Sequence, residues 1–218
     1  MQTKDEVAIH IYETGEIVVE EINGGIKSYK QVSANTIVEC VKASITTEMV
    51  ISGVLPEGTI CFSSGNNGYK YVCIEFPEQY SDIVYEKTEY KHFPIPRLVF
   101  GFVINGETIS SVRLGVAEPG KITPKTKMYI YPFSNVSGFN LCCGTNHFPK
   151  IKSLHQLTGI MYFIMSMPNN NDHYRNERTR LDLEYRELLE ALKDKTPEYY
   201  YSDVLIPSGK TISNFIKN

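Results

Sequence analysis

The chain has 218 residues, of which 42% are hydrophobic and 22% charged, and its formal net charge is −3 at pH 7. This size allows a substantial core in one large or two small domains. The charge excludes a strongly basic protein that binds nucleic acid or anionic membranes through its net charge. Since no run approaches the roughly 18 apolar residues of a spanning helix, we expect a cytoplasmic protein without direct nucleic-acid or membrane contacts.

The N-terminal region is predicted to form a β-hairpin. Two β-rich runs, residues 7–12 and 16–22, flank a Thr-Gly turn, and an Asn-Gly-Gly sequence at 23–25 ends the second run. Ser33 is a typical N-cap residue, and the apolar residues that follow at helical spacing predict a short helix. We therefore expect residues 1–32 to be an extension that precedes a main domain over residues 33–195.

The central part of the chain is predicted to be antiparallel. Its β-rich segments are residues 59–64, 69–76, 97–104 and 107–116. The last two are joined by Asn105-Gly106, a strong hairpin signal. A polar stretch, 77–96, separates the second segment from the third. The pattern predicts a four-stranded antiparallel meander, followed by a proline-containing surface connection.

The C-terminal half is predicted to add a loop and two helices. Residues 128–131 form a short extended segment, and a loop rich in glycine and asparagine follows. Ser153 then precedes a helix that ends before Pro168, with an apolar stripe of Leu154, Leu157, Ile160, Met161, Ile164 and Met165. A second helix is expected over residues 176–194, and the tail, 196–218, is expected to pack on the domain. The predicted fold class is α+β.

The cysteines do not form a metal or redox motif. There are five in the chain, and none has C-x-x-C spacing. A Gly-Lys-Thr sequence at 209–211 resembles the end of a phosphate-binding loop, but the glycine expected five positions earlier is Val204. We therefore expect neither a cofactor nor a metal. Cys142 and Cys143 differ from the others because they lie in the loop before the first C-terminal helix, where a nucleophile can be accessible.

The order of elements and the residues of this loop resemble the ubiquitin-conjugating enzyme (UBC) fold. Tyr131-Pro132 and Asn135 stand where that family has its His-Pro-Asn signature, Gly138 is the turn glycine, and a Met-Pro-Asn step at 167–169 closes the helix. Two features differ from the signature: tyrosine replaces histidine, and two residues separate the proline from the asparagine. Within the superfamily the chain is most similar to prokaryotic family D, the B component of the PRTRC cassettes of bacterial plasmids and other mobile elements.

This resemblance implies a function and its partners. A cysteine would take a ubiquitin-like protein as a thioester from a ubiquitin-activating-type adenylating enzyme and pass it to an amine, and a JAB-type metalloprotease would counteract the transfer. Asn135 and Asn146 are the candidate donors to the oxyanion of the reaction. His147 would supply positive charge near the thiol, and Asp172 matches an acidic loop position that tunes an incoming lysine. Tyr131 occupies the position of the signature histidine.

The sequence leaves two choices open. Counting from the asparagine selects Cys143, whereas the local pattern of hydrophobic residue, cysteine, any residue and glycine selects Cys142. Alternation in a short extended segment favours Cys142, because Leu141 and Cys143 would then share one side and Cys142 the other. The altered signature also allows a second function, in which the chain is a catalytically inactive UBC-fold module that serves as a docking surface in a larger assembly.

Overall fold

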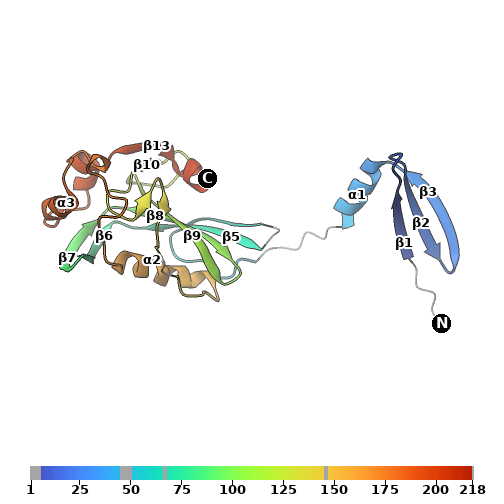
Figure 1. Ribbon diagram of the computed structural model, residues 1–218, viewed down its shortest axis with the longest axis horizontal. Coiled ribbons are helices and arrows are strands. Elements are labelled where there is room, and N and C mark those ends of the chain that lie inside the picture. The colour runs from blue at the N-terminus through green and yellow to red at the C-terminus, as the bar shows by residue number, and fades with distance from the viewer. Residues whose placement is uncertain (1–5, 45–50, 66–67, 145–146, 218) are drawn as a thin grey trace. The chain divides into compact units, whose positions relative to one another are not determined.

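The computed structural model describes residues 6–44, 51–65, 68–144 and 147–217, and the chain divides into two compact units, Met1–Val50 and Ile51–Asn218 (Figure 1). Both are built on antiparallel sheets, and the protein belongs to the α+β class, as predicted. None of the helices in the described ranges is long and apolar enough to cross a membrane.

The first unit is a three-stranded antiparallel sheet followed by a helix. Its elements are β1 (Glu6–Ile11), β2 (Ile17–Asn23), β3 (Ile26–Val32) and α1 (Ala34–Ser44). The predicted helix is present, and the Ser33 side chain caps it by accepting a 3.1 Å hydrogen bond from the backbone N–H of Thr36. The third strand was not predicted, because the glycines at 24 and 25 make a second hairpin turn instead of ending the hairpin. The helix groups with this sheet, in a unit that ends at Val50.

The second unit contains a large curled sheet. The four predicted strands are consecutive antiparallel neighbours: β4 (Thr59–Ser64), β5 (Tyr69–Phe76), β8 (Leu98–Asn105) and β9 (Thr108–Ala117). Further strands extend the sheet beyond β9: β10 (Lys127–Tyr129), β11 (Val136–Ser137), β12 (Asn140–Leu141) and β13 (Pro207–Thr211). Among the described residues, the four predicted strands therefore form one end of an eight-stranded sheet, which is larger than the predicted four-stranded meander.

The stretch 77–96 is a separate hairpin and not a connection. It forms β6 (Gln79–Tyr85) and β7 (Thr88–Ile95), which pair with each other. Polar and charged residues occupy the exposed positions of this hairpin, so its apolar residues do not stand out as strands in the sequence. The buried side chains are Ile83, Tyr85, Tyr90, Phe93 and Ile95. A two-stranded hairpin is only marginally stable by itself, so burial of these side chains in the main core holds it.

Each face of the main sheet has its own apolar core. Along β5, the side chains of Val72, Ile74 and Phe76 enter a large cluster that contains α2 (Leu157–Ser166), whereas Cys73 points to the opposite face. There it joins a smaller cluster with Phe215 of α4 (Ile212–Lys217). Figure 1 shows α2 and the C-terminal elements on opposite sides of the sheet. Strands covered on both faces are apolar at successive positions, as in β5 and β8.

Of the two helices predicted after the loop, the structure confirms the first and alters the second. A short 3₁₀ turn, η1 (Leu154–Gln156), leads into α2, and all members of the predicted apolar stripe are buried. The second helix is shorter than predicted. A 3₁₀ turn, η2 (Asn176–Arg178), is separated from α3 (Tyr185–Leu192), because Asp182 has a positive φ of 50° and Thr179 bridges to Leu205. A π-helical turn, η3 (Tyr200–Val204), precedes β13.

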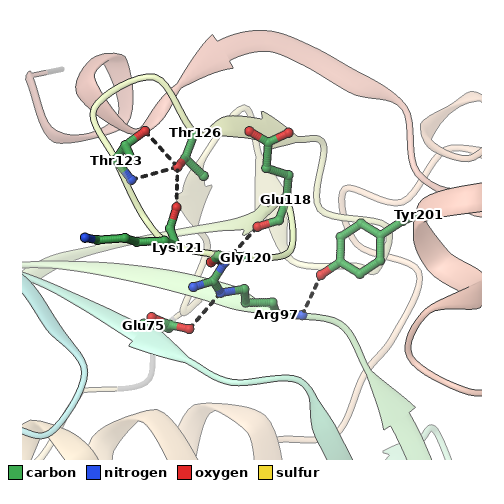
Figure 2. Close-up of polar contacts among 8 residues, drawn as sticks. All are labelled: Glu75, Arg97, Glu118, Gly120, Lys121, Thr123, Thr126 and Tyr201. Carbon is green, nitrogen blue, oxygen red and sulfur yellow. Dashed lines mark hydrogen bonds and ion pairs between the residues drawn. The ribbon is translucent and has the colours of Figure 1, made fainter.

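Arg97 links the main sheet to the segment between β9 and β10 (Figure 2). Its Nε donates a 2.7 Å hydrogen bond to Glu75, and its Nη1 donates to the backbone carbonyls of Glu118, at 2.8 Å, and Gly120. Its backbone N–H donates to the Tyr201 hydroxyl at 3.1 Å. The guanidinium is nearly buried and is compensated by one carboxylate and two carbonyls, as a buried charge requires.

Replacing Arg97 tests this role. Arg97→Met removes the charge that compensates the partly buried Glu75, and we expect the free energy of unfolding to fall by about 3 kcal/mol. The measurement is urea denaturation followed by circular dichroism, since the chain lacks tryptophan. Lys91→Met is the matched control: its pairs with Asp82 and Glu89 are exposed, so a loss below about 1 kcal/mol is expected. Equal losses in the two variants would contradict the assignment.

Candidate functional site

A small hairpin at the edge of the main sheet positions the two loop cysteines. Strands β11 and β12 pair with each other, and the turn between them uses Gly138, whose φ is +60°. The hairpin is attached to β9 by pairing of Asn140 with Arg113 and by a 2.8 Å hydrogen bond from the Leu114 N–H to the Phe139 carbonyl. Cys142 follows β12 directly, so the sheet edge fixes where its backbone lies.

Asn135 connects the loop to the segment after α2. Its backbone N–H donates a 2.8 Å hydrogen bond to the Asp172 carbonyl, and its own carbonyl accepts a 2.7 Å hydrogen bond from the Cys142 N–H. The residue has a positive φ of 61°, a conformation that asparagine tolerates better than most residues. These contacts use the backbone, and the Asn135 side-chain amide makes no hydrogen bond to any residue that the structure describes.

Asn169, which follows α2, makes hydrogen bonds that join the loop before β11 to other parts of the second unit. Its side-chain Oδ1 accepts hydrogen bonds from the hydroxyls of Ser134, at 3.3 Å, and Tyr185, at 3.0 Å. Its backbone N–H donates to the Val84 carbonyl at 2.7 Å, and its carbonyl accepts from the Glu86 N–H at 3.0 Å. Ser134 and Tyr185 are both buried, so Asn169 supplies the acceptor that these hydroxyls need away from water.

Four of the predicted site residues line one hollow. Asn135, Cys142, Cys143 and Asp172 surround a volume of about 200 Å³, together with Gly144, Met167, Pro168 and Asn170. Asp172 is held in a tight turn, in which its N–H donates to the Asn170 side-chain oxygen at 2.8 Å and its carboxylate accepts from the Asn170 amide at 2.7 Å. The hollow thus combines a thiol, an amide and a carboxylate.

The two cysteines differ in exposure, in the way that strand alternation predicts. Cys142 is exposed, whereas Leu141 and Cys143 are partly buried. The Cys143 Sγ lies 3.9 Å from the Leu141 carbonyl, which is within reach of a weak S–H hydrogen bond. Burial raises the pKa of the Cys143 thiol, and the neighbouring Cys142 raises it further. Cys142 is therefore the more accessible nucleophile of the pair.

The other predicted site residues are not brought into the hollow. Tyr131 is buried, and burial raises the pKa of its phenol. It lines a neighbouring internal cavity of about 30 Å³, which shares Asn135 and Met167 with the hollow. His147 is exposed and does not line the hollow. Asn146 lies outside the described residues. Asn169 and its partner Ser134 were not predicted as site residues. The available signal was a polar residue directly after the proline that ends an apolar helix.

Comparison with known proteins assigns no family to the chain. No protein-family model, no curated protein and no solved structure matches it. The function is therefore inferred from the site itself and from the resemblance described above.

Asn169 is predicted to stabilise the site. Asn169→Leu preserves the approximate volume but leaves the Ser134 and Tyr185 hydroxyls without their acceptor, so we expect a loss of about 2 kcal/mol in the free energy of unfolding. Asn176→Ala is the control, because Asn176 makes one exposed hydrogen bond, to Glu184, and its loss should cost less than about 0.5 kcal/mol. Urea denaturation measures both values.

The cysteines are predicted to differ in reactivity. With a small alkylating reagent at neutral pH, Cys142 should react faster than Cys143, because it is exposed and its neighbour has a raised pKa. Mass spectrometry of Cys142→Ser and Cys143→Ser measures each thiol separately. Modification of Cys143 should increase as the pH rises, since only the thiolate reacts. Faster modification of Cys143 at neutral pH would contradict the assignment.

Proposed function

We propose that this protein is a ubiquitin-conjugating-like carrier of prokaryotic family D. It takes a ubiquitin-like protein as a cysteine thioester and passes it to an amine acceptor. The observation that supports the proposal best is the exposed Cys142 thiol in the hollow with Asn135 and Asp172. A docking surface needs no exposed nucleophile beside an amide, whereas acyl transfer needs both.

The chemistry assigns a role to each group. The Cys142 thiolate attacks the activated C-terminal carbonyl of the ubiquitin-like protein, a C–S bond forms, and the thiol of the adenylating enzyme leaves. An acceptor amine then attacks the thioester carbonyl, a C–N bond forms, the C–S bond breaks, and Cys142 is released as thiolate. In each step the side-chain amide of Asn135 donates to the oxyanion. The Asp172 carboxylate orients the amine and accepts its proton.

The position of the signature histidine has a packing role in this proposal. Tyr131 is buried and its ring contacts Phe133 edge-to-face, with ring centroids 5.4 Å apart. It therefore shapes the core behind the loop and does not contact the substrate. We likewise assign a packing role and no chemical role to Cys143, because its thiol is partly buried.

One observation favours the second candidate function, the inactive docking module. No Lys, Arg or His is among the described residues that line the hollow, and its charged member is a carboxylate. A cation or a helix N-terminus is the usual means of raising the thiolate fraction of a cysteine, and its absence from this lining would slow thioester formation. In the docking function, the main sheet and α2 bind partners in the cassette assembly, and Cys142 has no chemical role.

A thioester assay distinguishes the two functions. The protein is incubated with its adenylating enzyme, ATP and the ubiquitin-like partner, and a non-reducing gel is examined for an adduct that thiol reductant removes. We expect the adduct with wild type and Cys143→Ser and its absence with Cys142→Ser. Asn135→Ala should lower the rate of adduct formation by about a hundredfold, as loss of an oxyanion donor does elsewhere.

Asp172→Asn separates the two steps of the reaction. The adduct should still form, but discharge to free lysine should slow, because the amide cannot accept the amine proton. An absent adduct in wild type, or one that persists when both Cys142 and Cys143 are serine, would exclude the carrier function and leave the docking module. A JAB-type metalloprotease that removes the transferred protein from its acceptor would support the carrier.

A further inference from the structure

The sheet of the first unit has one strongly apolar face. Residues paired directly across antiparallel strands share a face, and successive residues alternate. The register places Val7, Glu21 and Ser28 in one row across the sheet, and the parallel rows lie on the same side. We call this the apolar face; its apolar members are Val7, Ile9, Ile11, Ile17, Val19, Ile26 and Val32.

The opposite face is more polar, although Val18 and Ile22 also lie on it, and its charges pair around Glu20. Glu20 accepts hydrogen bonds from His10 at 2.9 Å, from Lys27 at 2.7 Å and from the Tyr29 hydroxyl at 3.2 Å. Lys27, and then His10, lower the pKa of the Glu20 carboxyl to about 2. The charges of this cluster therefore need no further partner.

The apolar face is exposed. Val7, Ile9, Ile11 and Ile26 are exposed to 65%, 48%, 75% and 76%. None of the described residues of this unit is buried, including those of α1. Folded units this small have too little apolar burial to be stable without further support, such as association, and contiguous exposed apolar surfaces mark interaction sites. The unit thus requires an occupant for this face.

The charges on the apolar face indicate what the occupant is. Its charged members are one acid, Glu21, and one base, Lys30, and neither forms an ion pair with a described residue. If two copies of this face pack about a two-fold axis, the acid of each copy can lie opposite the base of the other. A face with one charge of each sign is therefore complementary to itself. A partner of uniformly acidic or basic character would complement only one of the two charges.

The register also gives the crossing angle of such a pair. Glu21 is two residues from Val19 along β2, or about 6.8 Å, and Lys30 is directly across from Val19, about 4.8 Å away. A two-fold axis in the interface that exchanges these two positions lies at about 55° to the strands. The strands of the two copies therefore cross at about 70°, which is closer to the orthogonal than to the aligned arrangement of packed sheets.

We infer that the apolar face binds the same face of a second copy of this chain. The two sheets form a symmetric, nearly orthogonal sandwich, in which Glu21 of each copy pairs with Lys30 of the other. Three strands of this length offer a projected area on the order of 300 Å² per copy. This is a small interface, so we expect a dissociation constant on the order of micromolar.

Sedimentation velocity of the full chain from about 1 to about 200 µM tests the inference, since this range spans the expected dissociation constant. Wild type should change from monomer to dimer within it. Ile9→Glu places a charge in the apolar face and should weaken the dimer by at least about tenfold. Gln31→Glu is the matched control, because it adds the same charge on the opposite face of the same sheet, and it should leave the dimer unchanged. Circular dichroism verifies that both variants are folded.

Exchanging the charges of Glu21 and Lys30 provides a second test. Both positions are exposed, so the substitutions should not affect folding. Glu21→Lys and Lys30→Glu should each weaken the dimer, because symmetry places like charges opposite each other twice per dimer. The double variant should restore the wild-type dissociation constant to within about threefold, since the pair is re-formed with its signs exchanged. A chain that stays monomeric, a dimer unaffected by Ile9→Glu, or a double variant no stronger than the single ones would overturn the inference.

Discussion

The candidate site depends on the side-chain oxygen of Asn169. This one acceptor serves the buried hydroxyls of Ser134 and Tyr185, which come from the loop before β11 and from α3, while the backbone of Asn169 pairs with β6. Four segments that are distant in the sequence therefore meet at one residue. Because a buried hydroxyl without a partner is costly, the loop that precedes the cysteines has little freedom to move away from α2.

That constraint places the reactive groups indirectly. The segment after Asn169 presents the Asp172 carbonyl to Asn135, and Asn135 in turn accepts from the Cys142 N–H. Backbone hydrogen bonds thus link the segment that carries Asn169 to the residue that carries the exposed thiol. The side chains of Asn135 and Cys142 are left available, which is the arrangement expected when a rigid support carries a small reactive surface.

The sequence predicted the strands and helices that have strong local signals. Asn105-Gly106 and the apolar stripe of α2 were sufficient, because turn chemistry and helical periodicity act over short distances. The β6–β7 hairpin was missed because its polar residues face solvent, and the second C-terminal helix was overextended because a bridge from Thr179 to Leu205 competes with helix formation. At the site, the relative exposure of Cys142 and Cys143 followed from alternation. The role of Asn169 did not, since its partners are determined by tertiary packing.

The pairing of β10 with β13 has a consequence for synthesis of the chain. Ile212 and Phe215, which cover the second face of the main sheet, follow β5, β8 and β9 by a long stretch of sequence. While the ribosome is still making that stretch, Val99 and Ala117 remain uncovered. An emerging chain in this state exposes apolar strand surface, the condition that recruits chaperones to nascent proteins. The sheet can therefore close only when β13 and α4 have left the ribosome.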